Sequence, residues 1–169
     1  MLFRSLMAGL HIREIGGDEF ELVWPIFRQV ASSGETYTYP ADLAQEAARA
    51  MWTDAPARCF IAESDGHVVG CYRLVPNQMG PGSHVANGSY MVASDARGHG
   101  IGAALCAHSI DEARRNGFLA MQFNVVVSTN TGAVRLWQRH GFEIVGTLPN
   151  AFRHARHGLV DAYVMYRAL

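Results

Sequence analysis

The chain lacks the features that mark several large classes of protein. No apolar run in its 169 residues approaches the roughly 18 residues that a membrane-spanning helix needs. A strong charge of either sign is also missing, because the net charge is −1 and the isoelectric point is near 6.7. Binding to nucleic acid typically requires a basic surface. The sequence therefore predicts neither a membrane partner nor a nucleic-acid partner.

Cysteine is scarce, and histidine shows no metal-binding spacing. The three cysteines, Cys59, Cys71 and Cys106, are odd in number and sit in apolar patterns, which predicts buried free thiols. Scattered histidines that form no pattern such as H-E-x-x-H occupy positions 11, 67, 99, 108 and 140. We therefore expect no metal and, by default, a reducing cytoplasm.

The remaining composition is that of an ordinary globular domain. It is 49% hydrophobic and 17% charged, and the length suits a single core. No internal repeat, low-complexity tract or linker interrupts it, so we expect one domain over residues 1–169. The start, MLFRSLMAGL, has a short apolar stretch broken by Arg4, which we interpret as an ordinary N-terminus.

Hydrophobic periodicity predicts an α+β fold with one central mixed sheet. Pro25 is expected to kink or split the first helix unless it lies near the helix start, and Glu112 is expected to face solvent on a later helix. The basic run Arg153–His157 is interpreted as part of a solvated loop rather than a lid. The expected helices cover residues 19–31, 43–52, 101–113 and 132–140. The expected strands cover residues 10–15, 59–63, 68–75, 84–92, 121–127, 143–148 and 159–166, with a loop at 149–158.

A basic, glycine-rich turn, R-G-H-G-I-G at residues 97–102, links the strand at 84–92 to the next helix. Its alternate glycines let main-chain N–H groups approach a ligand closely, because no Cβ stands in the way. The first turn of a helix has unpaired N–H groups and a partial positive charge, to which Arg97 adds a full charge. This arrangement predicts a site for phosphate or pyrophosphate.

Three kinds of phosphate site use such a turn. A nucleotide P-loop is excluded because no Lys-Ser or Lys-Thr follows the glycines. A dinucleotide site fits Gly98, Gly100 and Ala103, but the next strand, ending F-N-V-V-V at residue 127, brings no acidic residue for a ribose. The third kind is an acetyl-CoA loop. The arrangement V-x-x-x-x-R-G-x-G-x-G from Val92 to Gly102 resembles motif A of the GCN5-related N-acetyltransferase (GNAT) superfamily.

A second, distant segment agrees with that resemblance. The pattern N-x-x-A-x-x-L-W followed by G-F, from Asn130 to Phe142, is similar to motif B of the same superfamily, in the family's order and usual separation. The resemblance implies a GNAT fold, a mixed and splayed sheet of about seven strands flanked by about four helices. It places acetyl-CoA in the splay between the strands that end at Val92 and Val127.

The resemblance also implies how acetyl-CoA is bound. Main chain near Tyr90 would pair with the pantetheine arm and donate to the oxyanion, the glycine turn would hold the pyrophosphate, and Asn130 would act near the sulfur. Trp137 stands where many members have a Tyr as acid for the leaving thiolate, and indole cannot give up a proton at neutral pH. Either Asn130 or a water then assists the thiolate, or another residue is the acid. The expected cofactor-binding residues are Tyr90, Met91, Val92, Arg97, Gly98, His99, Gly100, Ile101, Gly102, Asn130 and Trp137.

A narrower likeness suggests the acceptor. The segments S-H-V-A-N at residues 83–87 and F-N-V-V-V-S-T-N at residues 123–130 look like the yeast-type azetidine-2-carboxylate (proline-analogue) N-acetyltransferases. This likeness implies that Asn87 holds the substrate and that main chain at Asn124 and Val125 receives its carboxylate. Glu35 and Tyr37 lie in a polar loop that is either a substrate contact or a surface turn. Glu35 and His84 are candidate bases, but we assign no general base.

The sequence thus predicts an acetyl-CoA-dependent N-acetyltransferase, with a small amino-acid-like amine attacking directly in a ternary complex. Asn130 and Tyr90 are its expected catalytic residues. Alternatives are an acetyltransferase for another amine (a herbicide, an antibiotic or a protein N-terminus) and a non-catalytic acyl-CoA sensor. A dinucleotide-dependent oxidoreductase is a distant third. The sequence leaves the oligomeric state open; the last strands of such folds often meet across a dimer axis, and this analogy alone suggests a homodimer.

Overall fold

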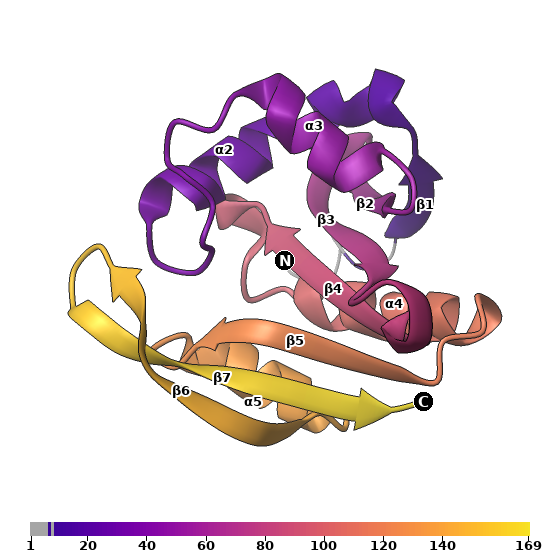
Figure 1. Cartoon of the computed structure of the whole chain (residues 1–169). Coiled ribbons are helices and arrows are strands. Elements are labelled where there is room, and N and C mark those ends of the chain that lie inside the picture. The colour runs from indigo at the N-terminus through magenta and orange to yellow at the C-terminus, as the bar shows by residue number, and fades with distance from the viewer. Residues whose placement is uncertain (1–6, 8) are drawn as a thin grey trace.

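A seven-stranded sheet, in the order β1-β2-β3-β4-β5-β7-β6, runs through the computed structural model of the chain (Figure 1). All neighbouring strands are antiparallel except β4 and β5, which are parallel, so the predicted mixed sheet is confirmed. The structure describes residue 7 and residues 9–169; most of the start MLFRSLMAGL lies outside the described residues. The strands are β1 (His11–Ile15), β2 (Arg58–Ser64), β3 (His67–Pro76), β4 (Val85–Val92), β5 (Ala120–Val127), β6 (Glu143–His154) and β7 (Gly158–Ala168).

Helices cover both faces of the sheet. Successive side chains of a strand point to opposite faces. Cys59, Cys71 and Met91 therefore pack under α2 and α3, while Tyr72 and Tyr90 pack with α4 on the other face. The helices are α2 (Trp24–Ser33), α3 (Gln45–Thr53), α4 (Ile101–Arg115) and α5 (Thr131–Arg139), with 3-10 turns η2 (Gly17–Leu22), η3 (Gly80–Gly82) and η4 (Ser94–Ala96).

Pro25 splits the first predicted helix in two. The segment begins as the 3-10 turn η2, and α2 starts only at Trp24, with Pro25 in its first turn. Proline is tolerated there because the N–H that it lacks has no partner in the first turn of a helix. Phe27 of α2 and Trp52 of α3 are completely buried and pack edge to face, 5.7 Å apart, which fixes both helices over the sheet.

The loop predicted at residues 149–158 is wrong. Strand β6 continues to His154, which pairs with Gly158 of β7. The prediction failed because a bulge between Leu148 and Phe152 interrupts the alternation of side chains, and its Asn150 has a φ of 52°. The basic run is therefore the tip of a β-hairpin, with its turn at residues 155–157; the run is exposed to solvent except for His154, which is buried.

That hairpin tip reaches the loop after α2. The main-chain N–H of Ala155 donates to the carbonyl of Gly34 at 3.0 Å, and Arg156 forms an ion pair with Glu35 at 2.7 Å. In Figure 1 the tip of β6 and β7 lies beside the loop that follows α2. Two segments far apart in the sequence thus meet on the side where β4 and β5 part.

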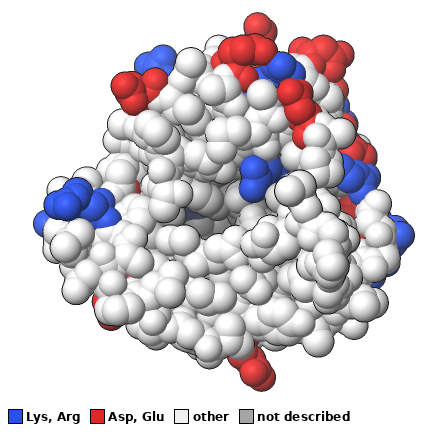
Figure 2. All heavy atoms as spheres, in the orientation of Figure 1, with Lys and Arg blue, Asp and Glu red and all other residues white. Residues whose placement is uncertain are grey.

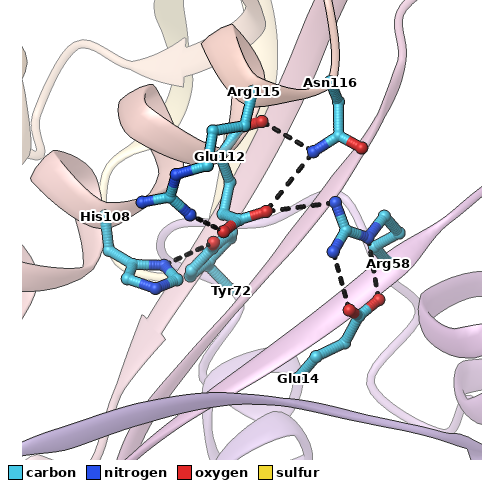
Figure 3. Close-up of polar contacts among 7 residues, drawn as sticks. All are labelled: Glu14, Arg58, Tyr72, His108, Glu112, Arg115 and Asn116. Carbon is cyan, nitrogen blue, oxygen red and sulfur yellow. Dashed lines mark hydrogen bonds and ion pairs between the residues drawn. The ribbon is translucent and has the colours of Figure 1, made fainter.

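A network of ionic contacts attaches α4 to the first strands (Figure 3). Arg58 of β2 forms a bidentate pair with Glu14 of β1, at 2.8 and 2.7 Å, and also contacts Glu112 of α4 at 3.1 Å. Glu112, predicted to face solvent, also pairs with Arg115, and its side chain is only 12% exposed. The solvent prediction failed because the opposite charge comes from a distant strand, which the helix pattern cannot reveal.

His108 belongs to the same region and gives a testable pH dependence. Its Nδ1 lies 2.8 Å from the Tyr72 hydroxyl, and burial lowers the pKa of His108. Because the unfolded value is about 6.5, protonation favours the unfolded chain. This contribution to the free energy of unfolding is fully present above about pH 6.5 and is lost as the pH falls through the folded pKa.

We expect urea unfolding between pH 5 and 8 to show wild-type stability declining below about pH 6.5, with a flatter profile for His108→Gln. Glutamine can still accept from or donate to Tyr72 but does not titrate. His67→Gln, at the exposed first residue of β3, is the matched control and should follow the wild type. Parallel profiles for wild type and His108→Gln would contradict the assignment.

Candidate active site

A cleft opens where β4 and β5 part. In the described residues, pairing of these strands stops after Val85–Ala120 and Ala86–Met121, and beyond that point they diverge (Figure 1). The cleft has a volume of about 470 Å³ and is lined by β3, β4, β5, α5 and the loop between α2 and α3. Figure 2 shows a hollow in this face with basic atoms at its edge, while the acidic atoms visible on the face lie away from it.

Main-chain groups of β4 face this cleft. The N–H of Ala93 donates to Val69 of β3, and alternate residues of a strand bond to opposite neighbours. Gly88, Tyr90 and Val92 therefore direct their N–H and C=O groups toward β5. Because β5 has moved away, these groups can pair with another molecule or another part of the chain.

The hydroxyl of Tyr37 takes up one of these positions. It accepts from the N–H of Tyr90 at 2.7 Å and donates to the Tyr90 carbonyl at 2.7 Å. Its ring stacks on Tyr39, with 5.6 Å between centroids. Burial raises the pKa of Tyr37 well above its ordinary value, so the hydroxyl keeps its proton and can donate. The polar loop thus reaches the cleft, and the predicted oxyanion donor of Tyr90 is bonded to Tyr37 in this structure.

The glycine turn adjoins one end of the cleft, which Arg97 lines. Gly98 and Gly100 have φ values of 78° and 84°, which L side chains rarely adopt. Gly100 is the N-cap of α4 and provides no side-chain cap, so the first N–H groups of the helix stay available to a ligand. A Cβ at Gly102 would meet Leu136 at 3.2 Å, so this glycine lets α4 and α5 approach closely. The side chain of Ile101 is buried and contributes to packing.

Asn130 and Trp137 form the α5 side of the cleft. Asn130 is the N-cap of α5, and its Oδ1 accepts from the N–H of Ala133 at 3.4 Å. Trp137 packs against Tyr90 and Phe123, with ring centroids 4.8 and 5.0 Å away. The structure therefore brings the motif B residues to the same cleft as the β4 main chain.

Amide side chains line the opposite part of the cleft. Asn87 donates to the carbonyl of Gln122 at 2.9 Å, which bridges β4 and β5 just beyond their last pair. Asn124 donates to Asn77 at 2.8 Å, and Val125 is 39% exposed. Asn87, Asn124 and Val125 thus lie together, as the narrower likeness predicts for the acceptor site.

Both candidate bases lie outside the cleft. Glu35 is paired with Arg156, and His84 is an exposed residue whose Nδ1 contacts the Pro81 carbonyl at 3.1 Å. In the described part of the chain, no aspartate, glutamate or histidine lines the cleft. The geometry therefore offers a neutral or cationic surface to the ligand and no acidic one.

Several residues that line the cleft were not predicted from the sequence, and Arg73 is the most informative of them. It lies on β3 opposite Ser89 and lines the cleft with the loop after α2. The available signal was a single charged residue within an otherwise apolar strand, V-V-G-C-Y-R-L-V. The other missed lining residues include Thr36, Thr38, Tyr39, Met51 and Ser89.

The described residues contain neither a candidate metal site nor a candidate membrane-spanning helix. Residue 7 and residues 9–169 contain no group of three or more His, Cys, Asp or Glu side chains placed to hold a metal ion. None of the helices in this same range combines the length and apolar character needed to cross a bilayer.

Comparison with known proteins identifies the class. The profile of the acetyltransferase (GNAT) family matches residues 20–142. The chain therefore belongs to the GNAT family, and the resemblance of its two motifs is confirmed. Over 98 residues the chain is 38% identical to N-acetyltransferase aca1 of Schizosaccharomyces pombe. The aligned segment covers 57% of this chain and 47% of that protein. The chain thus spans about half the length of this relative.

Two solved structures are similar to this chain over most of its length. A GCN5-related N-acetyltransferase from Kribbella flavida is 47% identical, with a TM-score of 0.92 over 96% of this chain and 99% of that one. A phosphinothricin acetyltransferase from Sinorhizobium meliloti in complex with acetyl-CoA is 21% identical, with a TM-score of 0.83 over 95% and 88% of the two chains. The second similarity concerns the fold alone.

Proposed function

We propose that this protein is an acetyl-CoA-dependent N-acetyltransferase for the amine of a small amino-acid-like molecule. The observation that carries the proposal is the cleft between β4 and β5, which has the glycine turn at one end and amide side chains in its other part. The named activities of GNAT relatives point to the same reaction. The mechanism is direct attack by the amine in a ternary complex.

The residues present fit acetyl-CoA as co-substrate. Positive-φ glycines and the uncapped start of α4 suit a diphosphate, which Arg97, Gly98, His99, Gly100, Ile101 and Gly102 would bind. The main chain of Tyr90, Met91 and Val92 would hold the pantetheine arm, because the parted β5 leaves the edge of β4 open. Asn130 and Trp137 would lie beside the sulfur.

Acetyl-CoA supplies the activated acetyl group when bound, and the side chains bind, orient and stabilise charge. Tyr90 would donate its N–H to the developing oxyanion once the Tyr37 hydroxyl releases it. No carboxylate or imidazole lines the described cleft, so the attacking amine passes its proton to water. Trp137 has no proton to give at neutral pH, and the Asn130 amide stabilises the leaving sulfur by hydrogen bonding.

A thiol-release assay with acetyl-CoA and a panel of small amines tests the proposal. We expect release that depends on both substrates and saturates with amino acids such as L-proline or azetidine-2-carboxylic acid. Tight CoA binding without turnover of any amine would instead favour an acyl-CoA sensor. Release with unrelated amines only, or with a peptide N-terminus, would move the assignment to one of the other acceptors.

Asn87→Ala should affect the acceptor more than the chemistry. A neutral hydrogen bond contributes about 0.5–1.5 kcal/mol, so we expect the KM for the amine to rise about 3- to 10-fold with little change in kcat. Steady-state kinetics at saturating acetyl-CoA measures both constants. Asn77→Ala is the matched control, because Asn77 bonds to Asn124 from outside the cleft. A fall in kcat alone would place Asn87 in the chemistry instead.

The cytoplasmic location and the homodimer stay predictions from the sequence. The cysteines, Cys59, Cys71 and Cys106, are free and buried, in keeping with a reducing cytoplasm. A homodimer is proposed only by analogy with other members of the fold. Analytical ultracentrifugation at two protein concentrations would test whether the chain forms a homodimer.

A further inference from the structure

One buried polar atom has no partner in the part of the chain that the structure describes. It is Nε of Arg73, on the cleft-facing side of β3. A buried donor without a hydrogen bond costs about 1–3 kcal/mol, and more when the group is charged. Such atoms are rare in native structures and call for an explanation. Nε itself is shielded from solvent, so a ligand in the cleft, which Arg73 lines, would satisfy this donor after the guanidinium turns toward it.

The guanidinium of Arg73 is held in place but not neutralised. Its Nη1 donates to the carbonyl of Met51 at the end of α3, at 3.0 Å. In the described residues it has no ion pair with a carboxylate, unlike Arg13, Arg49 and Arg58. One hydrogen bond therefore holds the group, and no carboxylate of the described residues neutralises its charge.

The charges of the cleft define the ligand that Arg73 suits. The described lining contains two charged side chains, Arg73 and Arg97, and both are cationic. Arg97 belongs to the glycine turn, where the diphosphate of acetyl-CoA is proposed to bind. Arg73 lies on the other side, opposite Ser89, which directly precedes Tyr90. It is thus the cation beside the acceptor and close to the proposed point of transfer.

We propose that Arg73 binds a carboxylate of the acceptor, so that the protein selects amino acids over neutral amines. This inference rests on the proposed function and assigns one anchor of its substrate. The Nε and Nη2 groups of an arginine lie on one edge and match the two oxygens of a carboxylate. The narrower likeness assigns the substrate carboxylate to the main chain at Asn124 and Val125, which is neutral. The full positive charge of an arginine compensates the dehydration of a carboxylate better than neutral groups do.

Matched acids and amides test the proposal through kcat/KM. The acceptors are L-proline, azetidine-2-carboxylic acid and L-alanine, each compared with its carboxamide, which keeps the amine and removes the negative charge. We expect the wild type to prefer the acids. In Arg73→Met the KM of the acids should rise about 30-fold or more, whereas the amides change less than about threefold.

Two further variants sharpen this experiment. Arg73→Lys keeps the charge without the planar fork, so its preference should be intermediate. Arg97→Met should raise the KM of acetyl-CoA and keep the preference for acids. An Arg73→Met variant that still prefers the acids would overturn the proposal and favour the main chain at Asn124 and Val125. An equal loss for acids and amides would overturn it as well.

Calorimetric titration in the presence of CoA separates this inference from the proposed function. If the acids bind the wild type but not Arg73→Met, and no amine is acetylated, the function fails and the carboxylate site stands. If amine acetylation occurs but acids bind no better than their amides, the function stands and the carboxylate site fails. Thermal denaturation checks that Arg73→Met is folded, which we expect because the substitution removes a buried donor without a partner along with the single hydrogen bond to Met51.

Discussion

Replacing Gly100 with glutamate is expected to weaken CoA binding about 100-fold or more and to stop acetyl transfer, because like charges in contact cost several kcal/mol. The new carboxylate would stand at the uncapped start of α4, where the diphosphate is proposed to bind. The φ of 84° adds a strain of about 1–2 kcal/mol. A Cβ there meets only ordinary contacts, with Met7 at 3.7 Å, so the fold should survive. Calorimetric titration with CoA measures the loss.

Gly66→Glu is the matched control for this change. Gly66 has a φ of 77° in the turn between β2 and β3, and a Cβ there would have nothing within 4 Å. It carries the same strain and charge but lies away from the glycine turn, so CoA should bind as in the wild type. If Gly100→Glu kept the wild-type affinity, the phosphate site would have to lie elsewhere. Equal losses in both variants would indicate an effect on the fold.

Replacing Tyr37 with phenylalanine should lower the stability of the free protein by about 2 kcal/mol, or about 4–8 °C in Tm. The N–H and the carbonyl of Tyr90 both lose their partner, the Tyr37 hydroxyl. Acetyl-CoA should then stabilise the variant more than the wild type, because its groups no longer displace a hydroxyl from Tyr90. Thermal denaturation with and without acetyl-CoA measures both effects.

Tyr39→Phe serves as the control for that experiment. Tyr39 stacks on Tyr37, and its hydroxyl accepts from the indole N–H of Trp52 at 3.0 Å, away from the β4 main chain. Its loss should lower stability without changing the increment that acetyl-CoA provides. If the increment for Tyr37→Phe equalled that of the wild type, Tyr90 would not be the group that acetyl-CoA engages.

Local patterns predicted the elements that position the cofactor half of the site. The glycine turn and the helix start were readable because φ values such as those of Gly98 and Gly100 restrict the residue type. The predicted order of helices and strands is confirmed except at residues 149–158. There, the bulge near Asn150 removes the two-residue period that the prediction needed.

The acceptor half depended on contacts between distant parts of the chain. Tyr37 meets Tyr90 across 53 positions, and Glu35 is held by Arg156 of the β6–β7 hairpin. No periodicity encodes such pairs, so the sequence could not decide whether the loop at Glu35 and Tyr37 was a surface turn. It also could not show that His84 lies outside the cleft, since exposure depends on how β4 and β5 pair.

The sequence by itself determined the family and the place of the glycine turn, because both rest on residue types at fixed spacing. The tertiary structure alone decided where β4 and β5 separate, which side chains line the opening, and that Arg73 has a donor without a partner. The physical reason is that burial and charge at a point in space are sums over segments far apart in the chain.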